Sequence, residues 1–285
     1  MIAHSFRADL HCHSSCSDGT ATSDEIILSA CSIGLQGLSI TDHDTIAAYE
    51  KAIAFAHSHH LPLITGVEFS TVHRKTSVHV LGYSFSPDAP SILNLCRRHS
   101  ERRKVRARAI LQRLSTRGVP LSWEELIEDQ PAHILPESIG RPHIALAMIK
   151  RGYVDSIKQA FQNYIGDNCP CYVPGESFSV EETLEAIHQA KGFAIIAHPH
   201  LVKSAKVLKD LLGMKFDGIE AYYARMPSSQ SQKWLKIAHQ KGWIATGGSD
   251  FHGTIKSNLP LGSSWVNQEI FTILYQRFRS NHVLL

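Results

Sequence analysis

Short apolar runs that end in histidine, aspartate or glutamate recur along almost the whole chain, and they constrain the fold more than any other feature. The segments are DLHCHS (9–14), ITDHD (40–44), GVEFS (66–70), SVHVLGY (77–83), AIIAHPH (194–200) and ATGGSDFH (245–252). Longer stretches with helical spacing separate most of them. Such alternation is typical of α/β folds with parallel strands covered by helices, which build their active sites at the C-terminal strand ends.

The spacing of apolar residues predicts the individual elements. We expect strands at 6–11, 37–44, 61–70, 77–85, 192–200, 216–224, 243–253 and 263–266. Helices are expected at 23–34, 45–60, 179–192 and 228–242. Ser23 or Asp24 suits the N-cap of the first helix, and Gly34 suits its C-terminal end.

The segment 97–170 interrupts this rhythm, because it contains helical patterns around 122–129 and 141–151 and no convincing strand. Its first part, 97–117, holds nine Lys/Arg and one acid, a local charge of +8 in a chain whose net charge is +3. A chain of 285 residues has room for a barrel with an insertion. We therefore predict a barrel made of 1–96 and 171–285 and a helical insertion domain at 97–170.

Taken singly, each polar residue has an ordinary structural explanation. His198 could be a hydrogen-bonded structural histidine, and Glu68 could cap a helix or form an ion pair. Six strands that each deliver such residues indicate a shared site, because unpaired buried charges cost several kcal/mol or more. Histidine and carboxylate ligands suit Mn²⁺, Zn²⁺ or Fe²⁺. The candidates are too numerous for one ion, so we expect two or three metals, a design typical of phosphoryl hydrolysis.

Other sequence features exclude several protein classes. No stretch approaches the roughly 18 apolar residues of a membrane span, and the N-terminal segment has no signal-peptide core, so a cytoplasmic protein is expected. The six cysteines form no CxxC pair, which favours free thiols over a zinc ribbon or a disulfide framework.

The motifs DLHCHS, SDG, ITDHD, GVEFS, HVLGY, AHP and SDFH, in that order, resemble the PHP (polymerase and histidinol phosphatase) family of metal-dependent phosphoesterases. The resemblance implies a distorted (β/α)₇ TIM-like barrel and a trinuclear metal centre, most often with Mn²⁺. The insertion and the phrase GRPHIA (140–145) further resemble the branch that hydrolyses 3′,5′-nucleoside bisphosphates and trims short RNA from the 5′ end.

The same resemblance implies the metal ligands. One metal would be held by His11, His13, Glu68 and Asp250. A second would share Glu68 and add His79 and His198. A third would take Asp18, His43 and His252. Asp18 lies in a loop and rests on the resemblance alone.

Substrate contacts are expected from the insertion. Arg141 offers a bidentate fork and His143 a hydrogen-bond donor for a second phosphate, although both could simply belong to a helix start. Arg102 and Arg106 of the basic helix are candidate phosphate contacts, with a solvated charged face as the alternative. His200 could orient a metal ligand or contact phosphate.

The expected substrate is a phosphorylated nucleotide or short RNA, with no membrane and no obligate protein partner indicated. Histidinol phosphate is the alternative substrate, although a small monophosphate needs no second anion site. A non-catalytic accessory module is the alternative of another class, and its metal content would be low.

Overall fold

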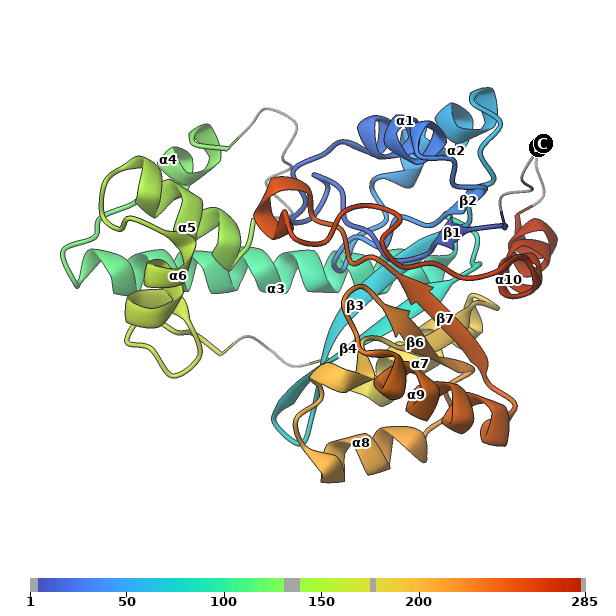
Figure 1. Cartoon of the computed structure of the whole chain (residues 1–285). Coiled ribbons are helices and arrows are strands. Elements are labelled where there is room, and N and C mark those ends of the chain that lie inside the picture. The colour runs from blue at the N-terminus through green and yellow to red at the C-terminus, as the bar shows by residue number, and fades with distance from the viewer. Residues whose placement is uncertain (1–4, 131–138, 175–177, 283–285) are drawn as a thin grey trace.

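The strands that carry the polar motifs form two hydrogen-bonded sheets (Figure 1). The structure is a computed structural model that describes residues 5–130, 139–174 and 178–282. A parallel pair consists of β1 (Ala8–Asp9) and β2 (Gly37–Leu38). The larger sheet has the order β3 (Gly66–His73), β4 (Thr76–Tyr83), β5 (Phe193–Ile196), β6 (Gly218–Tyr223) and β7 (Ile244–Gly248).

The prediction of uniformly parallel strands is wrong for β4. This strand pairs antiparallel with both β3 and β5, whereas β5, β6 and β7 are parallel to one another. The reason is the connection between β3 and β4, which consists of Arg74 and Lys75 alone, with φ of 48° and 64°. A two-residue turn with positive φ at both positions makes a hairpin, and it leaves no room for the crossover helix that a parallel pair needs.

The two sheets are linked by isolated bridges. Leu38 bridges to Leu63 and His43 to Glu68 on one side of the pair, while Cys12 bridges to Phe251 on the other. The ladders themselves stay open, so the structure establishes a mixed α/β fold and does not confirm the predicted barrel as a closed sheet. The predicted strand at 263–266 is absent, since only Val266 pairs there, in a single bridge to Ala8.

Helices cover the sheets. The four predicted at 23–34, 45–60, 179–192 and 228–242 lie close to where the spacing places them, and those at 205–212 and 268–281 were not predicted. They are α1 (Ser23–Ser32), α2 (Tyr49–Ser58), α7 (Val180–Gln189), α8 (Ala205–Leu212), α9 (Ser228–Lys241) and α10 (Gln268–Asn281). The N-cap of α1 is Thr22, not Ser23 or Asp24, because Thr22 and Glu25 form a capping box. No helix in the described ranges is long and apolar enough to cross a membrane.

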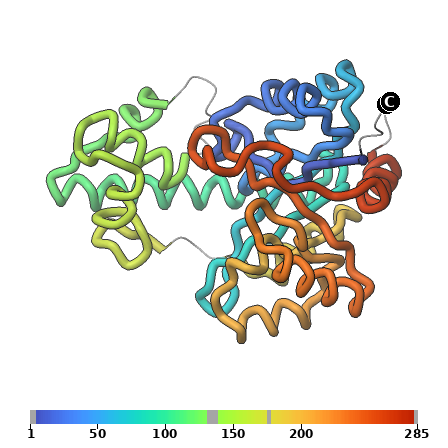
Figure 2. Tube along the Cα trace, viewed as in Figure 1, coloured from blue at the N-terminus to red at the C-terminus, as the bar shows by residue number. Residues whose placement is uncertain are grey.

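A separate helical lobe lies to one side of the sheets (Figure 2). It contains α4 (Trp123–Glu128), α5 (Arg141–Lys150), α6 (Ile157–Ala160) and the π-helical turn η2 (Phe161–Ile165). The long helix α3 (Pro90–Ser115) joins the lobe to the sheets, and at 1.5 Å per residue it is about 39 Å long.

The two halves of α3 pack into different cores. Ile92 and Leu95 lie in the main core, whereas Ile110 and Leu114 lie in the core of the lobe. The predicted start of the insertion at residue 97 therefore falls inside a continuous helix. Because α3 belongs to both cores, the lobe is tied to the sheets by a rigid element.

Candidate metal centre

The polar motifs converge at one edge of the two sheets. His11 and His13 follow β1, His198 follows β5, and Asp250 and His252 follow β7. These strands run in the same direction, so their C-terminal ends lie at the same edge, as expected from the sequence.

Glu68 and His79 lie at other positions in their strands than predicted. Glu68 is the third residue of β3 and lies near the start of that strand, not its end. His79 is in the middle of the antiparallel partner β4, where it pairs with Ser70. The hairpin brings the two side chains together, with His79 Nδ1 2.8 Å from Glu68 Oε1.

Three groups of potential metal ligands result, and within each group the ligand atoms lie within 4.8 Å of one another. The groups are His11, His13, Glu68 and Asp250; then His13, Asp18, His43 and His252; then His43, Glu68 and His79. The first equals the predicted set for one metal, and the second is the predicted third set with His13 added. His198 stands outside these groups, but its Nε2 lies 2.8 Å from Glu68 Oε1.

Glu68 is the centre of the arrangement. Its Oε2 lies 3.1 Å from Nε2 of both His11 and His13, and its Oε1 faces His79 and His198. A buried carboxylate with two oxygens facing separate sets of imidazoles is placed to bridge two cations. The family resemblance predicts such a bridging role for Glu68.

Several ring nitrogens have no hydrogen-bond partner among the described residues. Both ring nitrogens of His13 and Nδ1 of His43 are buried and unpaired in this sense. Buried polar groups are normally paired, and an unpaired one costs about 1–3 kcal/mol. Imidazole nitrogens facing carboxylates are ligands for a divalent cation, so the residues present fit a metal centre.

The electrostatics of the site keep the carboxylates ionised. Burial raises the pKa of Glu68, but His43 and His11 outweigh it and hold the pKa well below its usual range. The pKa values of Asp18 and Asp250 are also held well below the usual range, against the effect of burial, by neighbouring histidines.

The histidines respond in two ways. Burial lowers the pKa of His43 to about 3, against the opposing effect of Glu68 and Asp18. Burial also acts to lower the pKa of His13, but Asp250 and Glu68 outweigh it and raise the pKa to about 9. A divalent cation can replace such protons as the partner of the carboxylates, because metal ligands bind in their deprotonated form.

The sequence analysis missed Glu220, which holds two of the predicted ligands, His11 and His198, in place. This fully buried residue of β6 accepts a hydrogen bond from His11 Nδ1 at 2.8 Å and from the backbone N–H of His198 at 2.7 Å. The contact leaves His11 Nε2 facing Glu68, as a metal-ligating tautomer requires. A single acid within the apolar run GIEAYY was the only signal in the sequence.

Other acids of the motifs have structural roles. Asp42 accepts hydrogen bonds from the hydroxyls of Ser14 and Ser17, both at 2.6 Å. Asp9 accepts the backbone N–H groups of Ser249 and Gly262. These two acids order the loops that carry the ligands and do not belong to the three ligand groups.

Asp44 connects the metal centre to α3. It is buried, and Arg103 donates both to its carboxylate and to the carbonyl oxygen of His43. Nη2 of Arg102 lies 3.6 Å from the same carboxylate, and the pKa of Asp44 is held well below the usual range, despite burial, by His99 and Arg103.

Four of the predicted substrate contacts come from α3 and the lobe, namely Arg102, Arg106, Arg141 and His143. His143 is buried at the start of α5, where its Nδ1 accepts the N–H of Gly140 at 3.1 Å. His143 therefore does take part in the start of the helix, which was the alternative to a phosphate contact. Because Nδ1 accepts this hydrogen bond, the ring proton lies on Nε2. Asp18 and Arg103 influence the pKa of His143, so the ring is within electrostatic reach of the metal centre.

The arginines of the lobe form a group around one tyrosine. Arg141 and Arg106 lie 5.7 and 5.4 Å from the Tyr172 ring, and Arg141 also pairs with Asp167 at 2.7 Å. Arg106 Nε donates to the carbonyl of Val173. His200 lies elsewhere, in the 3₁₀ turn after β5, with its ring 4.6 Å from that of Tyr223.

Comparison with known proteins agrees with this centre. The profile of the PHP domain matches residues 9–274, nearly the whole chain. The chain belongs to the PHP family. A 5′-3′ exoribonuclease of Haemophilus influenzae is 32% identical to this PHP protein, over 86% of this chain and 89% of that one. A 3′,5′-nucleoside bisphosphate phosphatase of Chromobacterium violaceum is 30% identical over 86% of each chain.

Solved structures extend the agreement to the fold. A structure from Bifidobacterium adolescentis, named as a metal-dependent phosphoesterase, superposes with a TM-score of 0.84 at 29% identity, over 95% of this chain and 96% of that one. This PHP protein is thus a hydrolase of phosphoric esters, with His/Asp/Glu groups able to bind metal.

Proposed function

We propose that this PHP protein hydrolyses nucleotide phosphate esters, as a 3′,5′-nucleoside bisphosphate 3′-phosphatase or a 5′–3′ exoribonuclease on short RNA. The observation that carries the proposal is a polar group on the lobe, separate from the three ligand groups. In it Arg141 and Arg106 lie at the Tyr172 ring, and the pKa of the buried His143 is influenced by Asp18 of the metal centre. A substrate with one phosphate at the centre and a second one nearby uses both places, whereas a monophosphate uses only one.

Two to three divalent ions, with Mn²⁺ as the first choice, would be held by nine side chains. They are His11, His13, Asp18, His43, Glu68, His79, His198, Asp250 and His252. Ions bound there would supply Lewis-acid stabilisation of charge on the phosphoryl group. We further propose that the isolated bridges between the sheets complete a distorted seven-stranded barrel around these ligands.

The residues of the lobe would position the second phosphate. Arg141 lies beside the Tyr172 and Phe161 rings and pairs with the exposed Asp167, a surface partner that a substrate phosphate would replace. The Gly140 N–H fixes the proton of His143 on Nε2, which makes that nitrogen a donor to a phosphate oxygen. Residues 97–170 would then act as a substrate-binding domain on the barrel.

Arg102 and Arg106 remain candidates for weaker contacts, since each is already engaged within the protein. His200 would act at the rim of the centre, where its Nδ1 has no hydrogen-bond partner among the described residues.

The test uses metal-stripped protein reloaded with Mn²⁺ and offered adenosine 3′,5′-bisphosphate, a 5′-phosphorylated RNA pentamer and histidinol phosphate. We expect turnover of the bisphosphate or stepwise cleavage of the RNA. Arg141→Ala should raise KM by about tenfold or more, since charge-assisted bonds contribute about 1.5–3 kcal/mol. The matched control is Arg108→Ala, an exposed arginine that lies against Trp123 in the same lobe. Turnover of histidinol phosphate alone would overturn the proposal.

A further inference from the structure

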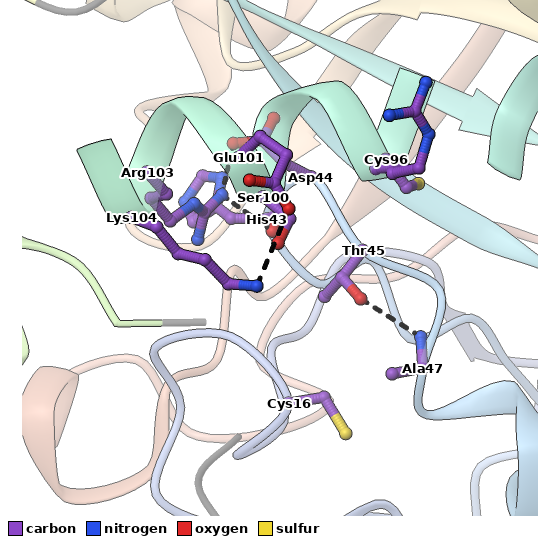
Figure 3. A pocket seen from close by; sticks show the side chains of 11 residues that line it. Cys16, His43, Asp44, Thr45, Ala47, Cys96, Ser100, Glu101, Arg103 and Lys104 are labelled. Carbon is purple, nitrogen blue, oxygen red and sulfur yellow. Dashed lines mark hydrogen bonds and ion pairs between the residues drawn. The ribbon is translucent and has the colours of Figure 1, made fainter. Parts of the chain in front are cut away.

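A pocket of about 300 Å³ opens next to the metal centre, between α3 and the loops that follow β1 and β2 (Figure 3). His43 lines it, so the pocket adjoins the group of ligands around Asp18. On the opposite side its wall is formed by α3, including Cys96 and Ser100. A ligand held at the centre could therefore extend directly into this pocket.

Two of the three Lys/Arg side chains that line the pocket are already paired with acids, and the third, Arg97, is exposed and bonds to an amide. Arg103 is paired with Asp44, and Lys104 Nζ lies 3.7 Å from the carboxylate of Glu101. Arg97 donates to the side-chain oxygen of Asn94 at 3.0 Å. A phosphate group beside Arg103 would have to break a buried ion pair, so the inner part of the lining does not favour an anion.

The remaining wall suits an uncharged, flat group. Cys16, Thr45, Ala47 and Cys96 contribute small side chains. Burial raises the pKa of the Cys16 thiol to about 11 and raises that of Cys96 as well, so both thiols stay neutral at physiological pH. Ser100 and Glu101 add a hydroxyl and a carboxylate at the edge, which can accept hydrogen bonds from ring N–H or amino groups.

We propose that this pocket holds the nucleobase of the nucleotide whose phosphate reaches the metal centre. The volume lies at the lower end of the range for small-molecule sites, about 300–1,000 Å³, and fits one nucleoside rather than several. The inference rests on the proposed function and deepens it. The uncharged base lies against the small side chains beside His43, while Arg141 and His143 hold the second phosphate on the lobe.

The test compares adenosine 3′,5′-bisphosphate with its base-free analogue, 1-deoxyribose 3,5-bisphosphate, on the Mn²⁺-loaded full chain. We expect kcat/KM to be at least about tenfold higher for the nucleotide. Ser100→Phe fills the pocket from the wall formed by α3. It should raise KM for the nucleotide by about tenfold and change KM for the base-free substrate by less than about twofold.

Two further variants make the comparison specific. Ala47→Phe fills the pocket from the opposite wall and should reproduce the effect of Ser100→Phe. Ser115→Phe is the matched control, because Ser115 is exposed at the far end of the same helix. Circular dichroism and thermal unfolding verify that each variant is folded.

The outcomes separate the two proposals. Equal kcat/KM for the two substrates in the wild-type protein overturns the base pocket and leaves the proposed function intact. Equal loss of both substrates in Ser100→Phe and Ala47→Phe also overturns it, because the pocket would then serve the phosphates. Failure to hydrolyse both bisphosphates, together with no cleavage of the 5′-phosphorylated RNA pentamer, overturns the proposed function and the base pocket with it.

Discussion

Glu220→Gln is the substitution that tests most directly how the site is held together. The carboxylate of Glu220 accepts two hydrogen bonds, from His11 Nδ1 at 2.8 Å and from the His198 N–H at 2.7 Å. A glutamine of the same shape has one acceptor oxygen and one NH₂ group. One of the two donors must therefore lose its partner, or His11 must change its tautomer.

Both arrangements of the amide have a cost. If the oxygen faces His11, the NH₂ group meets the N–H of His198, and an unsatisfied buried donor costs about 1–3 kcal/mol of unfolding free energy. If the NH₂ group faces His11, the ring proton moves to Nε2, which then points at Glu68 and no longer ligates. Loss of such outer support typically weakens metal affinity by about 10- to 100-fold.

The assay is a titration of metal-stripped protein with Mn²⁺, together with urea unfolding in the presence of chelator. Glu185→Gln is the matched control, because Glu185 is exposed on α7 and contacts only Gln189 among the partners described. We expect the Glu220 variant to lose stability without metal and to bind Mn²⁺ more weakly. If its metal affinity and stability equal those of the control, Glu220 does not orient His11.

Two more predictions concern groups that link the lobe to the centre. Asp44→Asn breaks a buried ion pair with Arg103 and should lower the unfolding free energy by about 3 kcal/mol, whereas Asp88→Asn at an exposed site should change it little. Burial lowers the pKa of His143 from about 6.5 in the unfolded chain to about 4, so the unfolded state binds the proton first and stability falls as pH falls between these values. His143→Gln should reduce the difference in unfolding free energy between pH 7 and pH 4 by about 3 kcal/mol, as measured by urea unfolding at both pH values. An unchanged difference would refute this explanation.

The positions of the site residues could be predicted largely because ligand-type side chains interrupt apolar runs. DLHCHS places His11 and His13 two residues apart beyond a buried strand, and the structure brings them together with Glu68 and Asp250. The alternation of side chains along one strand and the residue types at its end are local properties. A single sequence therefore contains them.

What failed depends on longer-range geometry. The turn Arg74–Lys75 lacks the Gly, Asn or Asp that normally marks a two-residue hairpin, so the reversal of β4 was invisible. Glu220 was missed because its role depends on two partners from other strands. Closure of the sheets into a barrel depends on bridges of one residue each. The spacing of apolar residues in the sequence does not predict such bridges.

The basic segment of α3 shows why a charge run is ambiguous until its partners are known. Arg98 pairs with Glu182, and Arg113 donates to the carbonyl of Tyr172. Arg103 joins the helix to His43 and Asp44. These contacts run from the sheets at one end of the helix to the lobe at the other. The charge of the segment 97–117 is therefore used largely to hold one long helix in place. Under the proposed function, the second phosphate is recognised by a few cations of the lobe, Arg141 first.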